Sequence, residues 1–246
     1  MLFTIDIKGS FISGIFFNDD IIITDYDKKR VVYLDNTGKQ IGVLSVPHKP
    51  TDITKVNDQT VAVSSDAQKI SIINVRPLTF VKTLHISVPV WGLCLVEDEY
   101  ITAYNNTIYW LNAETGAKIK QLAAGTGSDT RFVTSYRKSE YMYWGEQTIV
   151  KFESALGKSF QYNHSNLSNS YNQEIDGEGN VYVVGYSSNN IHQLTPTGQL
   201  IRIIPVSDIN NTITRCPWVM RFKRNTNRFL LTFNASAGPV LVCEIE

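Results

Sequence analysis

The chain has few of the features that mark a secreted, membrane-spanning or disulfide-stabilised protein. Its 246 residues include only three cysteines, Cys94, Cys216 and Cys243, an odd number without a Cys-x-x-Cys pair. This pattern favours free thiols in a reducing compartment. No run approaches 18 consecutive apolar residues, and the first ten residues, MLFTIDIKGS, lack the basic start and long apolar stretch of a signal peptide. We therefore expect a cytoplasmic protein that does not bind membranes.

Excess charge of one sign and helical periodicity are also missing. The 23 basic residues balance 23 acidic ones, so no overall field draws the chain to nucleic acid. No segment of 11 or more residues keeps a helical period. Apolar residues make up 43% of the chain and aromatic residues 11%, which is enough to build a core. The sequence therefore predicts a folded, all-β protein.

Short strand-like runs recur along the whole chain. The run VYVV at position 181 has relatives that start at 21, 61, 100, 141 and 229, so consecutive starts are 40, 39, 41, 40 and 48 residues apart. Each run is preceded by another apolar run and followed by two more, or by one in the last unit, with polar loops and turns between them. A four-strand repeat of roughly 40 residues is typical of a β-propeller blade. Six such units predict a six-bladed β-propeller.

The two ends of the chain complement each other in this arrangement. The sixth unit stops at Glu246 after its third strand, and residues 2–7, LFTIDI, form an extra strand ahead of the first unit. If this strand pairs beside VLVCEI, the ring closes without a long unpaired edge. We expect a single domain, 1–246, with approximate blades 8–46, 47–86, 87–124, 125–163, 164–206 and 207–246, the last completed by 1–7.

The letters of some repeats resemble a known family. The stretch IDGEGNVYVVGYSSNNIHQLTPTGQLIRII resembles an NHL repeat, and RCPWVMRF is similar to the start of one. Residues 47–75 resemble the propellers that end many invertebrate tripartite-motif (TRIM) proteins. The aspartate that usually follows the inner strand of an NHL repeat is Asp25 in blade one, but Gly185 and Phe233 stand there in blades five and six.

The resemblance carries functional expectations. In TRIM proteins a RING domain, which confers ubiquitin-ligase activity, precedes the propeller together with a B-box and a coiled coil. This chain has no Cys/His spacing for such zinc sites. The resemblance therefore implies a non-catalytic C-terminal module that binds a protein substrate or adaptor. It also implies a monomeric domain within a parent that dimerises through a coiled coil.

Candidate partner-binding residues are expected on one face of the propeller. This face carries the loops that lead into each innermost strand and the turns between the second and third strands, and recognition concentrates in loops on a rigid scaffold. Exposed Tyr, Trp and Arg dominate binding hot spots. Arg131 and Arg215 stand near the start of innermost strands, and each Trp also fits a wedge between blades. The candidates are Tyr26, Lys28, His48, Lys49, Trp91, Tyr104, Arg131, Tyr171, Tyr186, Arg215 and Trp218.

Two other functions stay open. An RNA-binding NHL propeller would use lysines and arginines of these loops for phosphates and their tyrosines for base stacking, although several aspartates lie in the same loops. A channel-metal hydrolase, such as a propeller lactonase, would need several ligands from different blades. Asp52 is the only strong candidate ligand at the inner-strand openings, and Asn172 or Glu174 adds one at best. We therefore expect no metal, no cofactor and no catalytic residue.

Overall fold

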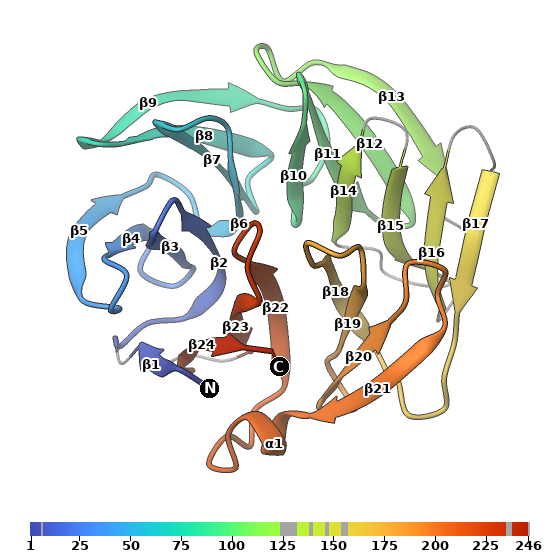
Figure 1. Ribbon diagram of the computed structural model, residues 1–246. Helices are drawn as coiled ribbons and strands as arrows, with labels where there is room; N and C mark the ends of the chain where they lie inside the picture. Colours follow the sequence, from blue (N-terminus) through green and yellow to red (C-terminus); the bar gives the residue numbers. More distant parts are fainter. Residues whose placement is uncertain are drawn as a thin grey trace.

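The computed structural model describes residues 1–5, 7–123, 132–137, 140–145, 148–153, 157–234 and 238–245. Its strands form six four-stranded antiparallel sheets arranged around a central axis (Figure 1). The prediction of an all-β, six-bladed propeller is confirmed. We call the sheets blades 1 to 6 in chain order.

In blades 1 to 3 the strands run in sequence order from the axis outwards. Blade 1 contains β2 (Phe11–Phe17), β3 (Asp20–Asp25), β4 (Arg30–Leu34) and β5 (Gln40–Ser45). Blade 2 contains β6 (Pro50–Lys55), β7 (Thr60–Ser65), β8 (Lys69–Val75) and β9 (Leu78–His85). Blade 3 contains β10 (Leu93–Val96), β11 (Glu99–Tyr104), β12 (Thr107–Asn112) and β13 (Lys118–Ala123).

The second half of the chain repeats this order. Blade 4 contains β14 (Val133–Arg137), β15 (Glu140–Gly145), β16 (Thr148–Glu153) and β17 (Gly157–Tyr162). Blade 5 contains β18 (Ser170–Ile175), β19 (Val181–Gly185), β20 (Asn190–Leu194) and β21 (Leu200–Pro205). A short helix, α1 (Val206–Ile209), follows and accounts for part of the longer interval before the sixth repeat. Among the described residues we find no helix with the length and hydropathy that crossing a bilayer requires.

Blade 6 is built from both ends of the chain. It contains β22 (Pro217–Phe222), β23 (Arg228–Phe233) and β24 (Val240–Glu244), and β1 (Phe3–Ile5) is its outer strand. Phe3 pairs with Val242 and Ile5 with Val240. The predicted closure of the ring is thus confirmed, with a strand shorter than the expected residues 2–7.

In blades 1, 2 and 5 the same hydrogen bond links the end of the outer strand to the turn between the second and third strands. Lys29, Gln68 and Asn189 have φ angles of 49°, 57° and 53° in the turns between second and third strands. Their carbonyls accept the backbone N–H of Val46, Ile86 and Val206 at 2.8, 3.1 and 3.1 Å, just after each outer strand ends. Equivalent positions of these blades can therefore be identified from the hydrogen bonds alone.

Burial follows the position of a strand within its blade. The middle strands β3, β4, β19 and β20 are buried on both faces, because neighbouring blades cover them. Their side chains form the cores between adjacent blades, such as the one that Val31 and Tyr33 of blade 1 share with Val63 and Ile73 of blade 2. The outer strands are exposed, and all six residues of β13 face solvent. Loops at the two ends of this rigid ring are therefore the places where a site can form.

Candidate functional site

Loops from neighbouring blades meet at one end of the central channel. We call this end the mouth face; it carries the loops into β2, β6, β10, β14, β18 and β22, together with the turns between second and third strands. The opposite end, with the remaining turns, is the far face. Ten of the eleven candidate residues belong to loops or strand ends of the mouth face, and the eleventh, Arg131, lies outside the described residues.

An aromatic group occupies the mouth, and we call it the mouth cluster. Its rings are Phe132, Tyr171, Tyr186 and Trp218, which come from blades 4, 5 and 6. The ring centroid of Trp218 lies 4.9 Å from Tyr171, 5.4 Å from Tyr186 and 6.5 Å from Phe132. Tyr171 and Tyr186 are 5.1 Å apart. Such distances are those of favourable tilted and edge-to-face contacts.

The members of the mouth cluster differ in exposure. Trp218 is buried, at 7% exposed, and packs against Phe132 and Ile12 of blades 4 and 1. Its indole N–H finds no acceptor among the described residues. Tyr171 and Tyr186 are half-buried, and Asn234 Nδ2 donates to the hydroxyl of Tyr186. Trp218 therefore wedges the blades together, while the two tyrosines remain partly exposed to solvent.

A polar group borders the cluster on blades 1 and 2. Tyr26 packs against the mouth cluster and donates its hydroxyl to Asp66 Oδ2 at 3.3 Å. Lys49 Nζ lies 4.5 Å from the centre of the Tyr26 ring, within the range of a cation–π contact. Burial, followed by the Asp66 charge, raises the pKa of Tyr26. Lys49 and Asp66 thus place opposite charges on either side of one tyrosine.

His48 and Lys69 form a second polar pair beside it. Lys69 Nζ lies 3.0 Å from His48 Nε2, and both side chains are half-buried. Burial, followed by the Lys69 charge, lowers the pKa of His48. The imidazole is therefore neutral at physiological pH and accepts the hydrogen bond from the ammonium group.

The buried side chain of Asp25 stabilises the turn at residues 27–30 of blade 1. This buried carboxylate accepts the backbone N–H of Ser10 at 3.0 Å and that of Lys28 at 3.3 Å, and it pairs with Arg30 Nε at 2.8 Å. The Lys28 ammonium is exposed and donates to the carbonyl of Lys8. Asp25 therefore neutralises Arg30 and shapes the turn, while Lys28 and Lys29 are its exposed cations.

Three further candidates belong to blades 3 and 6. Trp91 and Tyr104, both half-buried, belong to blade 3, where the Trp91 carbonyl accepts Ser64 Oγ at 3.0 Å. Arg215 is half-buried in the segment just before β22. Arg131 lies outside the described residues. The structure thus brings together Tyr26, Lys49, Tyr171, Tyr186 and Trp218.

The channel itself is crossed by an ion-paired arginine. Arg221 of blade 6 contacts Asp52 Oδ2 of blade 2 at 2.9 Å and Glu174 Oε2 of blade 5 at 3.3 Å. Asp52 also accepts the backbone N–H of Leu93 at 2.8 Å and the hydroxyl of Ser13. The two carboxylates that were weighed as metal ligands therefore share a guanidinium. The described residues contain no group of three or more His, Cys, Asp or Glu side chains placed to hold a metal ion.

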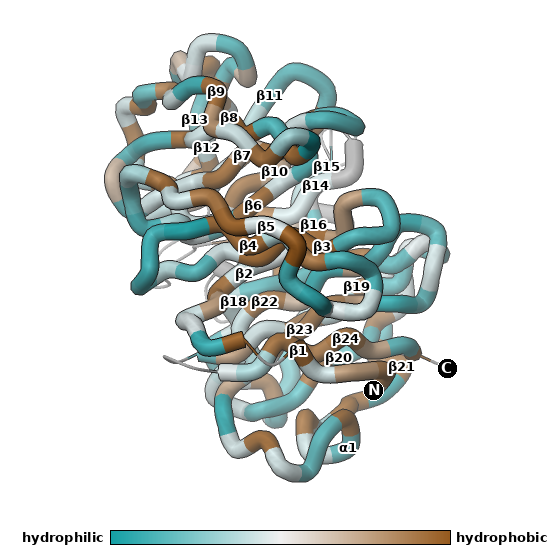
Figure 2. Tube along the Cα trace, turned by 90° about the vertical axis from the view of Figure 1, so that its left-hand side faces the viewer, coloured by the Kyte–Doolittle hydropathy of each residue, from teal (hydrophilic) through white to brown (hydrophobic). Residues whose placement is uncertain are grey.

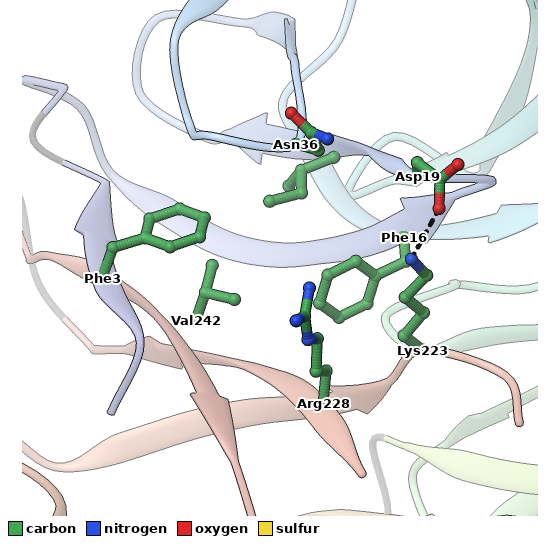
Figure 3. A pocket seen from close by; sticks show the side chains of 8 residues that line it. Phe3, Phe16, Asp19, Asn36, Lys223, Arg228 and Val242 are labelled. Atoms are coloured by element: carbon green, nitrogen blue, oxygen red, sulfur yellow. Dashed lines mark hydrogen bonds and ion pairs between the residues drawn. The ribbon is translucent and has the colours of Figure 1, made fainter. Parts of the chain in front are cut away.

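Two small hollows lie on the far face. One, of about 80 Å³, opens between blades 6 and 1, where Lys223 pairs with Asp19 at 2.7 Å beside Phe16 and Arg228 (Figure 3). Another, of about 140 Å³, lies beside Asp176 between blades 5 and 6. Both fall short of the roughly 300 Å³ at which small-molecule sites begin. Their size argues against a pocket for a small substrate.

Sequence reasoning missed Arg221 and Asn234. Arg221 stands as a single charge within the apolar inner-strand run PWVMRF, and a lone charge in an otherwise buried strand was the signal for a channel partner. Asn234 directly follows β23, in the slot where other blades carry a turn residue. Nothing in the sequence links it to Tyr186 of another blade.

Comparison with known proteins supports the fold. No protein-family model matches the sequence. No curated protein matches it either. Among solved structures, the chain is similar to the β-propeller domain of Cps50 (Swd1) from Myceliophteria thermophila, with a TM-score of 0.68 at 10% sequence identity. The match covers 96% of this chain and 84% of that chain. At this identity the likeness shows a β-propeller fold and nothing further.

Proposed function

We propose that the chain is a non-catalytic recognition module that binds a protein partner through its mouth face. The observation that carries the proposal is the mouth cluster, in which Tyr171 and Tyr186 stand half-exposed on the buried Trp218. Aromatic side chains held rigidly before binding lose little conformational entropy when a partner covers them. The cluster and the polar group beside it, with Tyr26, Lys49 and Asp66, form the candidate interface.

The charge pattern of the mouth face favours protein over RNA. Asp25 pairs with Arg30, and Asp66 lies beside Tyr26 and Lys49, so carboxylates stand next to two of the cations. A phosphate backbone needs a continuous basic track. The tyrosines of the mouth cluster also pack on one another and on Trp218, so part of their surface is already in contact with other rings.

The channel-metal hydrolase is the least favoured function. Arg221 places a positive charge against Asp52 and Glu174, the very carboxylates that a divalent cation would need. A cation entering there would have to displace the guanidinium from two ion pairs. Catalysis by a channel metal therefore has no support in the arrangement of these residues.

The resemblance to NHL repeats supplies the finer part of the proposal. In that setting the propeller, taken as one domain over residues 1–246, would be the C-terminal substrate-binding domain of a TRIM-type ubiquitin ligase. The ligase activity would belong to a RING domain of the parent, and a coiled coil would make the parent a dimer. Mass spectrometry of the full-length natural protein, read for a RING domain ahead of this sequence, tests this context separately from the binding face.

Site-specific photo-crosslinking tests the binding face. A photoreactive phenylalanine analogue replaces Ser187, which is exposed in the mouth-face turn of blade 5, and the matched control replaces Glu178, which is exposed in the far-face turn of the same blade. Irradiation in an extract of the source cells should give discrete adducts from position 187 only. Adding Lys49→Glu to the Ser187 variant should weaken them.

The nature of the adduct separates the two binding functions. Protease-sensitive adducts that resist nuclease support a protein partner. Adducts that nuclease removes would replace the proposal with RNA binding. Equal adducts from positions 187 and 178, or none from 187, would contradict a role for the mouth face.

A further inference from the structure

We propose that the outer edge of blade 2, strand β9, is a second binding site that accepts an extended peptide of alternating apolar and acidic residues as a fifth strand of the sheet. This site lies on the outer rim of the ring (Figure 1), with its His85 end next to the mouth-face turn of blade 2. It does not depend on the function proposed for the mouth face. Addition of a strand to an exposed sheet edge is a general mode of peptide recognition.

The backbone of β9 is open to a new strand. In the described chain β9 pairs only with β8, and its eight residues make it the longest strand. Ile86 N donates to Gln68 O at 3.1 Å, which makes these two residues a hydrogen-bonded pair. Bonded pairs alternate along an antiparallel ladder. Thr83 and His85 therefore turn their backbone N–H and C=O groups away from β8, towards solvent.

The outer edge of blade 5 shows how the same position can be closed. Val206 N donates to Asn189 O just as Ile86 N donates to Gln68 O, so Pro205 in β21 corresponds to His85 in β9. A proline has no N–H to offer, and natural sheets use it to protect their edges. β9 contains no proline, so its outward donors stay available.

One flank of the β9 edge is apolar. Leu78 and Phe80 lie opposite Val75 and Ile73, which belong to the core between blades 1 and 2, so they face blade 1. Leu78 Cδ2 lies 3.2 Å from the place that a Cβ on Gly42 of β5 would occupy, which sets the two outer strands side by side. Phe80 is 43% exposed. Figure 2 shows apolar stretches on this side of the ring.

The other flank is basic. The register shift at Val81 puts Lys82 on the opposite face from Phe80, across from Ile72 of the core between blades 2 and 3. Lys82 Nζ reaches the carbonyl of Glu114 in blade 3 at 3.2 Å. Lys118 of β13 lies opposite Leu111 of the same core, so both ammonium groups border the space between these blades.

These flanks define the occupant. Side chains of an added strand alternate between its two faces, so one set would meet Phe80 and the other would meet Lys82. The strands β5, β9 and β13 contain no Asp or Glu, which leaves acidic residues as the complement to the lysines. A second copy of the chain is a poor occupant. Two β9 strands side by side would each contribute Lys82 and His85, and neither strand has a carboxylate to balance the lysines.

A labelled synthetic peptide tests the site. The probe is an eight-residue peptide that alternates Glu and Val, and binding is followed by fluorescence anisotropy at low salt. We expect saturable binding, no binding of the matched Lys/Val peptide, and a dissociation constant raised roughly tenfold by Lys82→Glu. His85→Pro, which copies the natural Pro205, should raise it at least as much because it removes an outward donor.

Matched variants keep the test decisive. Ser45→Pro changes the equivalent position of β5, which precedes the bond from Val46 N to Lys29 O, and should leave binding unchanged. Thermal melts identify any proline variant that fails to fold. If one fails, the effect of Lys82→Glu on peptide binding alone tests the site. Absence of binding at about 1 mM peptide, full binding by Lys82→Glu and His85→Pro, or an equal loss in Ser45→Pro would overturn the proposal. A wild-type dimer in sedimentation that His85→Pro abolishes would instead identify a second copy as the occupant.

Discussion

The guanidinium of Arg221 in the last blade lies 2.9 Å from the carboxylate of Asp52 in the second blade. The pair links the inner strands of blades 6 and 2, which blade 1 separates in the ring. Asp52 is fully buried. A second contact to Glu174 extends it to blade 5. One side chain thus joins blades 2, 5 and 6.

Removal of that side chain should be costly. Arg221→Met leaves the Asp52 carboxylate buried without its counter-charge, and we expect the free energy of unfolding to fall by about 3–5 kcal/mol. Urea denaturation measures the change. Arg228→Met is the control, because Arg228 is exposed and its nearest carboxylate, in Glu244, is 3.9 Å away; a loss below about 0.5 kcal/mol is expected there. Equal losses in both variants would show that the channel pair contributes nothing special.

Protonation of His192 should destabilise the fold in mild acid. The ring is fully buried, Tyr162 OH lies 2.7 Å from Nδ1, and burial lowers the pKa of His192 to about 4. The unfolded chain binds a proton near pH 6.5, whereas the native one resists it until about pH 4. Stability is therefore full above pH 6.5 and falls as the pH drops towards 4, by about 3 kcal/mol at most. Unfolding free energies of the wild type and His192→Asn across this range check it; parallel curves would contradict the assignment.

Alanine substitutions at two glycine turns should distinguish the cost of backbone strain from the cost of steric crowding. Gly179 and Gly198 have φ angles of 89° and 85°, which an L side chain adopts only at a cost. A Cβ on Gly179 would lie 3.4 Å from Pro196, an ordinary contact, whereas one on Gly198 would lie 2.6 Å from Phe160. Gly179→Ala should thus lose about 1 kcal/mol of unfolding free energy and Gly198→Ala about 2–3 kcal/mol, by denaturation. A larger loss for Gly179→Ala would refute the packing of Phe160 on this turn.

Trp218 and Lys49, both on the mouth face, should differ in how much they contribute to the stability of the fold. Trp218→Ala removes a buried ring between blades 4, 5 and 6 and should lower the unfolding free energy by about 3–5 kcal/mol. Lys49→Ala removes the cation–π contact with the half-buried Tyr26 ring and should stay within about 0.5 kcal/mol of the wild type. Thermal and urea unfolding of both variants give the comparison. An unchanged stability of Trp218→Ala would mean that this ring does not wedge the blades.

The sequence predicted local order well and contacts between blades poorly. Strand runs such as VYVV and the extra strand LFTIDI carry their own period, so the blades and the closure of the ring followed from spacing. The approach of Tyr171 and Tyr186 to Trp218 depends on how blades 5 and 6 are tilted, which no local pattern encodes. For the same reason Arg221 escaped notice, because inner-strand alternation does not reveal which side chain reaches across the channel.

The pairing of β1 with β24 has a consequence for synthesis. Phe3 is synthesised before the five intervening blades, whereas its partner Val242 is synthesised after them. During elongation residues 3–5 therefore wait unpaired while the intervening blades form, and the seam closes only after translation reaches residues 240–244. A chain released before that point would leave β1 and β23 without the strand that lies between them, so two sheet edges would stay open. Premature termination would therefore create an aggregation hazard in addition to an incomplete blade.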